Sequence, residues 1–219
     1  MKHTTLALFA VAALLLSANA NADKNLGIGV KAGTLGIGVE GTWRALPWID
    51  LRLGMNRYDY DDDGTQAGIP YDATLALDSF YATANLRFPL SPFRLTGGIY
   101  SNSNELQLTS VADGTFEIGG INFNAADVGT LSSVTSFPST SPYVGIGYDF
   151  TLMGRVGLNL DLGVLWQGDP EVTLVADGVL ATDPTFISAL ESERQELDDE
   201  VSDYKAWPVL SIGFVVNFM

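Results

Sequence analysis

The stretch YDYDDDGTQ, residues 58–66, gathers four aspartates in a chain that is otherwise rich in glycine and apolar residues. Asp59, Asp61 and Asp63, with a glycine directly after them, match the first half of a calcium-binding loop. The twelfth residue of such a loop is a bidentate glutamate, whereas here it is Pro70. The sequence therefore predicts an exposed acidic loop in which the three alternating aspartates bind a divalent cation weakly.

Several other functions are excluded by what the chain lacks. It has no cysteine, and His3, its one histidine, lies in a leader segment, so the mature chain has no imidazole base for a serine nucleophile and no His or Cys ligand for zinc. Asp50, Asp149 and Asp161 offer carboxylates such as glycosidases use, but their expected partners are arginines on neighbouring strands. With 26 acidic against 11 basic residues, the chain is not expected to bind nucleic acid. Neither enzymatic activity nor a cofactor beyond weakly bound Ca²⁺ is expected.

A secretory signal peptide is predicted over residues 1–22. A basic start precedes an apolar run, Leu6 to Leu16, and the small residues Ala20-Asn21-Ala22 follow as a cleavage site. The run is too short for a membrane-spanning helix, which needs about 20 apolar residues. Cleavage after Ala22 leaves residues 23–219 as one domain.

In the mature chain, apolar residues alternate with glycines and polar residues. Leu51 and Leu53, for example, alternate with Arg52 and Gly54. Strict alternation of this kind predicts β-strands. The same pattern extends over residues 26–33, 35–44, 49–56, 80–88, 93–99, 144–150, 156–166 and 210–218.

This alternation favours a membrane barrel over a soluble sandwich. The polar positions hold isolated charges of both signs among glycines, which suits a narrow interior, and aromatic residues gather near the strand ends, as at a membrane interface. The predicted fold is therefore all-β, an antiparallel up-and-down transmembrane β-barrel. Its interior polar network is predicted to contain Glu40, Arg52, Arg87, Arg94, Arg155 and Asp161.

The connections between strands alternate in length. Short links at residues 45–47, 89–92 and 152–154 alternate with long segments at about 59–72, 110–140 and 169–206. Outer-membrane barrels have short periplasmic turns and long extracellular loops, so the long segments are assigned to the outside. Eight strands are expected, with ten as the alternative if the central segment adds a hairpin to the wall.

The runs VKAGTLGIGVEGTW, IDLRLGMNRYDY and LDLGVLWQGDPEVTLVADG resemble a family of small proteobacterial outer-membrane β-barrel proteins that has no assigned activity. The architecture is similar to that of OmpA-like and opacity-type barrels. The resemblance implies fold and location and supplies no catalytic or binding residues. Near the C-terminus, Phe218 resembles the aromatic end of the signal that such proteins present to the barrel-assembly machinery.

One amphipathic helix is predicted at about residues 184–204, within the last long segment. Thr182 or Asp183 caps it, and Pro184 suits its first position. A stripe of spaced residues is expected to face the barrel mouth or a partner: Ile187, Leu190, Arg194, Leu197, Val201 and Tyr204. In the central segment, TFEI and INF around Gly119-Gly120 predict a small hairpin.

Together these features predict a non-enzymatic, monomeric barrel of the outer membrane of a Gram-negative bacterium, with a structural or surface-interaction role. The alternative is a narrow porin-like channel or a small-molecule transport barrel. The expected partners are outer-membrane lipid, lipopolysaccharide and the assembly machinery. A cation bound weakly at the acidic stretch is expected to be shared with the phosphates of lipopolysaccharide.

Overall fold

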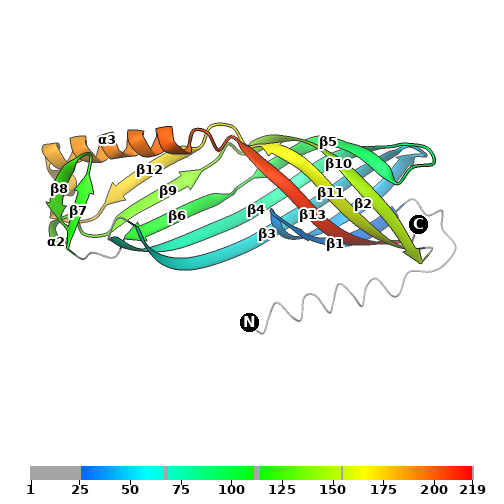
Figure 1. Ribbon diagram of the computed structural model, residues 1–219, viewed down its shortest axis with the longest axis horizontal. Coiled ribbons are helices and arrows are strands. Elements are labelled where there is room, and N and C mark those ends of the chain that lie inside the picture. Colours follow the sequence, from blue (N-terminus) through cyan, green and yellow to red (C-terminus); the bar gives the residue numbers. More distant parts are fainter. Residues whose placement is uncertain (1–25, 67–68, 111–113, 154, 219) are drawn as a thin grey trace.

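The alternating segments form long antiparallel strands in the computed structural model, which describes residues 26–66, 69–110, 114–153 and 155–218. Eight strands pair in a closed ring, so the barrel wall has no free edge among these residues (Figure 1). In ring order they are β1 (Leu26–Gly33), β2 (Gly36–Leu46), β3 (Ile49–Gln66), β4 (Ile69–Arg87), β5 (Phe93–Asn102), β10 (Thr140–Met153), β11 (Val156–Trp166) and β13 (Ala206–Asn217). The prediction of an all-β, eight-stranded barrel is confirmed. The predicted signal peptide lies outside the described residues.

Side chains of the barrel strands alternate between an exposed apolar exterior and a buried interior. On β3, Leu53 is 55% exposed whereas its neighbour Arg52 is 4% exposed. Such an apolar outer wall around a polar interior is the arrangement of membrane barrels. Within the described residues, no helix is long and apolar enough to cross a bilayer.

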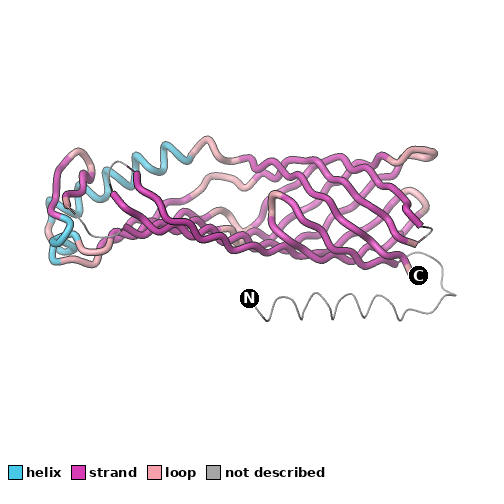
Figure 2. Tube along the Cα trace, turned by 60° about the horizontal axis from the view of Figure 1, so that its bottom comes forward, coloured by secondary structure: helices cyan, strands magenta, loops and turns pink. Residues whose placement is uncertain are grey.

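Beyond the barrel, β3 and β4 continue as a long hairpin that broadens into a sheet, which we call the extension. The part of β4 beyond the barrel pairs with β6 (Glu105–Ser110). The strands β9 (Leu131–Ser136) and β12 (Glu171–Ala176) follow in order. Figure 2 shows the extension running from the barrel to the far end of the molecule. The prediction of a loop at residues 59–72 is wrong, because Tyr58 to Gln66 pair residue by residue with β4.

A small cap lies at the far end of the extension, and its longer helix runs back alongside β12 toward the barrel (Figure 1). The cap consists of β7 (Thr115–Ile118), β8 (Ile121–Asn124), α2 (Ala125–Val128), η1 (Val179–Thr182) and α3 (Pro184–Val201). The predicted hairpin around Gly119-Gly120 is confirmed as β7 and β8, and both glycines have positive φ, as a tight turn requires. These two strands form a sheet of their own, so the ten-stranded alternative for the wall is wrong. The buried core of the cap contains Phe116, Ile118, Ala125, Val128, Phe186 and Ala189.

Helix α3 begins where the sequence predicts, but it packs against the cap with a different face from the predicted one. The Asp183 carboxylate accepts hydrogen bonds from the backbone N–H groups of Thr185 and Phe186 at 2.8 and 3.0 Å, as an N-cap does. The predicted apolar stripe is wrong at its start, because Phe186 is fully buried whereas Ile187 is 49% exposed. The aromatic ring of Phe186 packs edge-on against Phe123 of β8, and this contact sets the orientation of the helix.

Candidate functional site: the barrel interior

The interior of the barrel contains a layer of ion pairs near the short turns, which we call the charge layer. Arg52 on β3 lies 3.5 Å from Glu40 on β2 and 3.6 Å from Asp161 on β11, with its nitrogens facing their carboxylate oxygens. Arg94 on β5 lies 2.6 Å from Asp161 and 3.0 Å from Asp149 on β10. Since each arginine contacts carboxylates from different strands, the charge layer joins opposite sides of the wall.

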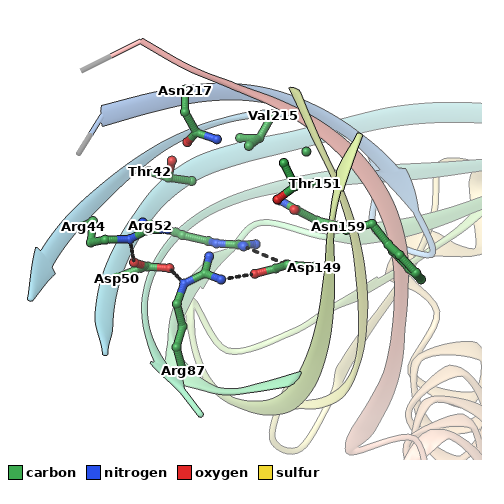
Figure 3. Close-up of a pocket in the computed structure, with 12 residues that line it drawn as sticks. Thr42, Arg44, Asp50, Arg52, Arg87, Asp149, Thr151, Asn159, Val215 and Asn217 are labelled. Atoms are coloured by element: carbon green, nitrogen blue, oxygen red, sulfur yellow. Dashed lines mark hydrogen bonds and ion pairs between the residues drawn. The ribbon is translucent and has the colours of Figure 1, made fainter. Parts of the chain in front are cut away.

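The charge layer extends to the mouth at the turn end (Figure 3). There Arg87 lies 2.7 Å from Asp149 and also pairs with Asp50, which Arg44 contacts at 3.3 Å. Three of these four side chains, Arg44, Asp50 and Arg87, lie next to the turns β2–β3 and β4–β5, so the short turns place them directly at the opening. Opposite charges therefore neutralise one another where the interior meets solvent.

Glycines on the inner face make room for the large interior side chains. A Cβ at Gly147 would overlap the guanidinium of Arg94, and a Cβ at Gly54 would overlap the ring of Tyr81. The Arg94 side chain is fully buried, and its Nη1 also donates to Thr96 at 2.9 Å and Asn85 at 3.3 Å. The glycine-rich alternation of the sequence is thus the space that a filled narrow barrel requires.

On the side of the charge layer that faces the extension, aromatic and aliphatic side chains form a second interior layer. Tyr81 and Tyr100 stack with ring centroids 4.9 Å apart. The Tyr81 hydroxyl donates to Glu40 at 2.8 Å and so links this layer to the charge layer. This tyrosine layer consists of Leu35, Tyr81, Tyr100, Tyr143, Leu165 and Val209, all at most 5% exposed. Leu35 reaches it from the turn between β1 and β2. A water-filled path would therefore have to cross a closely packed, partly apolar section.

A third group of interior side chains lies beyond the tyrosines, where the barrel meets the extension. Gln167 accepts hydrogen bonds from Asn102 at 2.8 Å and Asn104 at 3.1 Å, and Asn56 donates to Ser79 at 3.0 Å. These groups are buried. They form a third, hydrogen-bonded layer in addition to the charge layer and the tyrosine layer.

The cavities left in the interior are small. The recess at the turn end, lined by Arg44, Asp50, Arg87 and Asp149 among others, has a volume of about 80 Å³. The space between the charge layer and the tyrosines has a volume of about 10 Å³, which is close to the room one water needs. Arg52 Nε and Arg94 Nη2 are buried without a protein partner, so such waters have donors to bind.

The structure brings together five of the six residues predicted for the interior network: Glu40, Arg52, Arg87, Arg94 and Asp161. Arg155 is exposed in the turn between β10 and β11, because it precedes the first wall residue of β11. Sequence reasoning missed the tyrosine layer and Lys31, whose ammonium lies 3.9 Å from the centre of the Tyr81 ring. The alternation does place Tyr81 among the inward positions, which is the available signal.

The three aspartates of the calcium-like pattern lie on a strand. Asp59, Asp61 and Asp63 point to one side of β3, where alternate residues are about 6.6 Å apart along the strand. Asp59 pairs with Arg57 at 3.4 Å, and Asp61 accepts a hydrogen bond from Thr74 at 2.9 Å. Across the described residues, no group of three or more His, Cys, Asp or Glu side chains is arranged to hold a metal ion.

Phe218 follows β13 directly. Its backbone N–H donates to the Leu26 carbonyl at 3.0 Å, which extends the pairing of β13 with β1 by one more bond. The aromatic end of the chain therefore lies at the seam where the barrel closes. Its role as an assembly signal stays a prediction.

The solvent face of α3 carries a local ion-pair group whose titration can be predicted. Arg194 contacts Glu191 at 2.8 Å and also pairs with Asp198. Hydrogen bonds from Arg194 and from Gln195 lower the pKa of Glu191 from 4.5 to about 2. A carboxyl group with a lowered pKa stabilises the folded helix above pH 4.5, and this contribution is lost as the pH falls through about 2.

We therefore expect Arg194→Gln to raise the pKa of Glu191 toward 4.5 in a carboxyl-carbon NMR titration. Lys205→Gln is the matched control, because Lys205 pairs with Asp169 and should leave Glu191 unchanged. A Glu191 carboxyl that titrates near 4.5 in the unaltered protein would contradict the ion-pair geometry.

Comparison with known proteins identifies the fold. No protein-family model and no curated protein sequence matches the chain. The crystal structure of Acinetobacter baumannii CarO2 matches with a TM-score of 0.59 and 22% identity, covering 90% of this chain and 100% of that one. Acinetobacter baumannii CarO matches with a TM-score of 0.57 and 24% identity, covering 88% of this chain and 97% of that one. The resemblance to small outer-membrane barrels is confirmed as a likeness of fold.

Proposed function

We propose that this chain is a sealed, non-enzymatic barrel of the Gram-negative outer membrane, with a structural or surface-interaction role. The observation that carries the proposal is the filled interior, in which the charge layer and the tyrosine layer leave spaces of only about 80 and 10 Å³. An eight-stranded barrel is just wide enough for side chains to fill it. The barrel then acts as an anchor, and the extension and cap are the parts available to other molecules.

The placement in the membrane rests on the outer surface of the barrel. Its strands expose large apolar side chains, such as Leu162 at 55% and Phe214 at 51%, and such a surface needs lipid around it. The short turns lie at one end and the extension at the other (Figure 1), so the extension is assigned to the outside and the turns to the periplasm. Lipid, lipopolysaccharide and the assembly machinery are the proposed partners, and the closed wall favours a monomer.

The barrel itself can be tested by its migration on a gel. The folded barrel is expected to migrate faster than the boiled protein, because a closed β-barrel stays compact in detergent until it is heated. A mutant that cannot close, such as one lacking β13, serves as the control and should show a single position. Identical migration of the boiled and unboiled full chain, with recovery in the soluble periplasmic fraction, would contradict the proposed placement.

The sealed interior predicts the absence of channel activity. In planar bilayers the purified chain should give no stable, reproducible openings, whereas an open porin reconstituted in the same bilayers should. The unpartnered Arg52 Nε and Arg94 Nη2 make a narrow polar channel the second candidate, since waters or ions could bind them. Reproducible openings of the unaltered protein would overturn the sealed barrel and establish that second candidate.

A further inference from the structure

The lipid-facing wall contains a hollow that its own side chains do not fill. The hollow spans β1 to β5 in the half of the barrel next to the short turns and has a volume of about 860 Å³. Two rows of outward residues cross it, and their pairing along the strands makes them continuous. One row is Leu26, Trp43, Leu51, Ala84 and Gly97, and the other is Ile28, Gly41, Leu53, Ala82 and Ile99.

The floor of the hollow consists of four small residues: Gly41, Ala82, Ala84 and Gly97. The two glycines are not required by the packing of the wall. A Cβ at Gly41 would have its nearest neighbour at 3.9 Å and one at Gly97 at 4.0 Å, whereas a Cβ at the inward Gly147 would overlap Arg94. The outward glycines therefore leave open space on the outer surface, and the inward ones make room for side chains.

Large residues border this floor. Trp43, Leu53 and Ile99 are 51%, 55% and 57% exposed, and Phe218 joins the border next to Leu26. On the rest of the ring, β11 and β13 carry a continuous set of large outward side chains: Leu158, Leu160, Leu162, Leu210, Ile212 and Phe214. The floor of small residues is thus a local feature of β2, β4 and β5.

We propose that this hollow binds an acyl chain of a phospholipid from the leaflet on the short-turn side. The proposal rests on the membrane placement given above. The hollow is continuous with the apolar belt that faces lipid, and its volume lies within the roughly 300–1,000 Å³ of small-molecule sites, which are mostly apolar. An acyl chain in the bilayer is already out of water, so the closer packing of the chain against the floor is what distinguishes this site.

A second copy of the chain fits the hollow less well than an acyl chain does. A two-fold symmetric dimer uses the same patch on both subunits, so filling each hollow would require a rigid border residue of one copy, such as Trp43, to match the floor of the other. A flexible acyl chain can instead follow the floor between the borders formed by Trp43 and Ile99. The acyl chain is therefore the occupant that the shape favours.

The test uses the full mature chain, folded in detergent micelles and titrated with phosphatidylethanolamine, with bound lipid counted by native mass spectrometry. The unaltered protein should retain one lipid at concentrations where Ala84→Leu/Gly97→Leu, which fills the floor, retains at least tenfold less. Val164→Leu is the control, because it enlarges an outward residue of β11, outside the hollow. It should bind lipid like the unaltered protein.

The remaining outcomes separate this proposal from the proposed function. Equal lipid retention by all three proteins, or none by the unaltered one, would overturn the acyl-chain site while the fast-migrating folded form still supports the barrel. A mass of two copies that falls to one in the filled variant would overturn it in favour of a dimer. If the double variant does not fold, Gly41→Leu fills the same floor from β2 and is judged by the same measurement.

Discussion

Replacing Arg94 with methionine is expected to lower the free energy of unfolding of the barrel by about 3–5 kcal/mol. The guanidinium is fully buried and contacts both Asp149 and Asp161. Removing it leaves these carboxylates in the interior with fewer partners, and an uncompensated buried charge costs more than the pair contributes. Urea unfolding in phospholipid vesicles, followed by tryptophan fluorescence, measures the change.

Two further variants separate the ion pairs from general effects of substitution. Arg57→Met removes an arginine that is 73% exposed and paired with Asp59 on the extension, so its effect should stay within about 0.5 kcal/mol. Arg94→Lys keeps the charge but loses the planar donor set, and it should fall between Arg94→Met and the unaltered protein. If Arg94→Met and Arg57→Met were equally stable, the charge layer would not be holding the barrel together.

Replacing Phe186 with alanine is expected to destabilise the cap by about 3–5 kcal/mol while the barrel stays intact. Phe186 is fully buried, and its ring packs against Phe123 in the small core that joins α3 to β7 and β8. A cavity in so small a core cannot be refilled by its neighbours. Native-state hydrogen exchange should therefore show faster exchange of the β7 and β8 amides, with the barrel amides unchanged.

The neighbouring residue provides the matched control. Ile187 is of similar apolar character but is 49% exposed, so Ile187→Ala should leave exchange of the β7 and β8 amides nearly unchanged. A larger effect at Ile187 than at Phe186 would restore the helix face that the spacing of apolar residues predicts. The two substitutions thus decide which side of α3 faces the core.

The barrel could be predicted from the sequence because lipid imposes a simple rule on its strands. Outward residues are mostly apolar and inward ones mostly small or polar, and Leu51, Arg52, Leu53 and Gly54 follow this alternation. The short turns then fix the order of the strands. Closure required only that β1 pair with β13, which an even number of antiparallel strands allows.

The extension could not be predicted in the same way because the rule stops at the membrane surface. From Tyr58 to Asp61 aromatic and acidic residues alternate, Asp62 and Asp63 follow, and both sides of the strand are exposed. Aspartate and glycine are also uncommon in strands, so this stretch has the composition of a loop. Its strand conformation comes from pairing with β4, residue against residue, up to the end of the hairpin.

The charge layer was partly readable from the sequence, whereas the tyrosine layer was not. Isolated inward charges such as Glu40 and Arg52 need partners wherever they are buried, and this physical requirement holds without coordinates. Inward tyrosines carry no such requirement, since Tyr100 and Tyr143 would suit a membrane interface equally well. Only the structure shows that these tyrosines lie between the charge layer and the extension, where they close the barrel interior.

The aspartates of YDYDDDGTQ acquire a role from the edge on which they lie. The pairing of β2 with β3 ends at Arg57, and beyond it the described part of β3 pairs with β4 alone. An exposed strand edge of this kind can pair with another chain, and charged side chains oppose such pairing. The acidic run thus lies on the exposed edge of β3, next to the exposed rings of Tyr58 and Tyr60. There its negative charges oppose pairing with another chain.

The pairing of β1 with β13 also governs how this protein can be made. Gly27 lies opposite Asn217, so β1 and β13, the first and last strands of the barrel, are neighbours in the wall. Contacts between such distant residues form slowly, because a long loop must close before they stabilise anything. The barrel therefore cannot close until β13 is available to pair with β1, and every earlier stage exposes two unpaired strand edges that must be kept from aggregating.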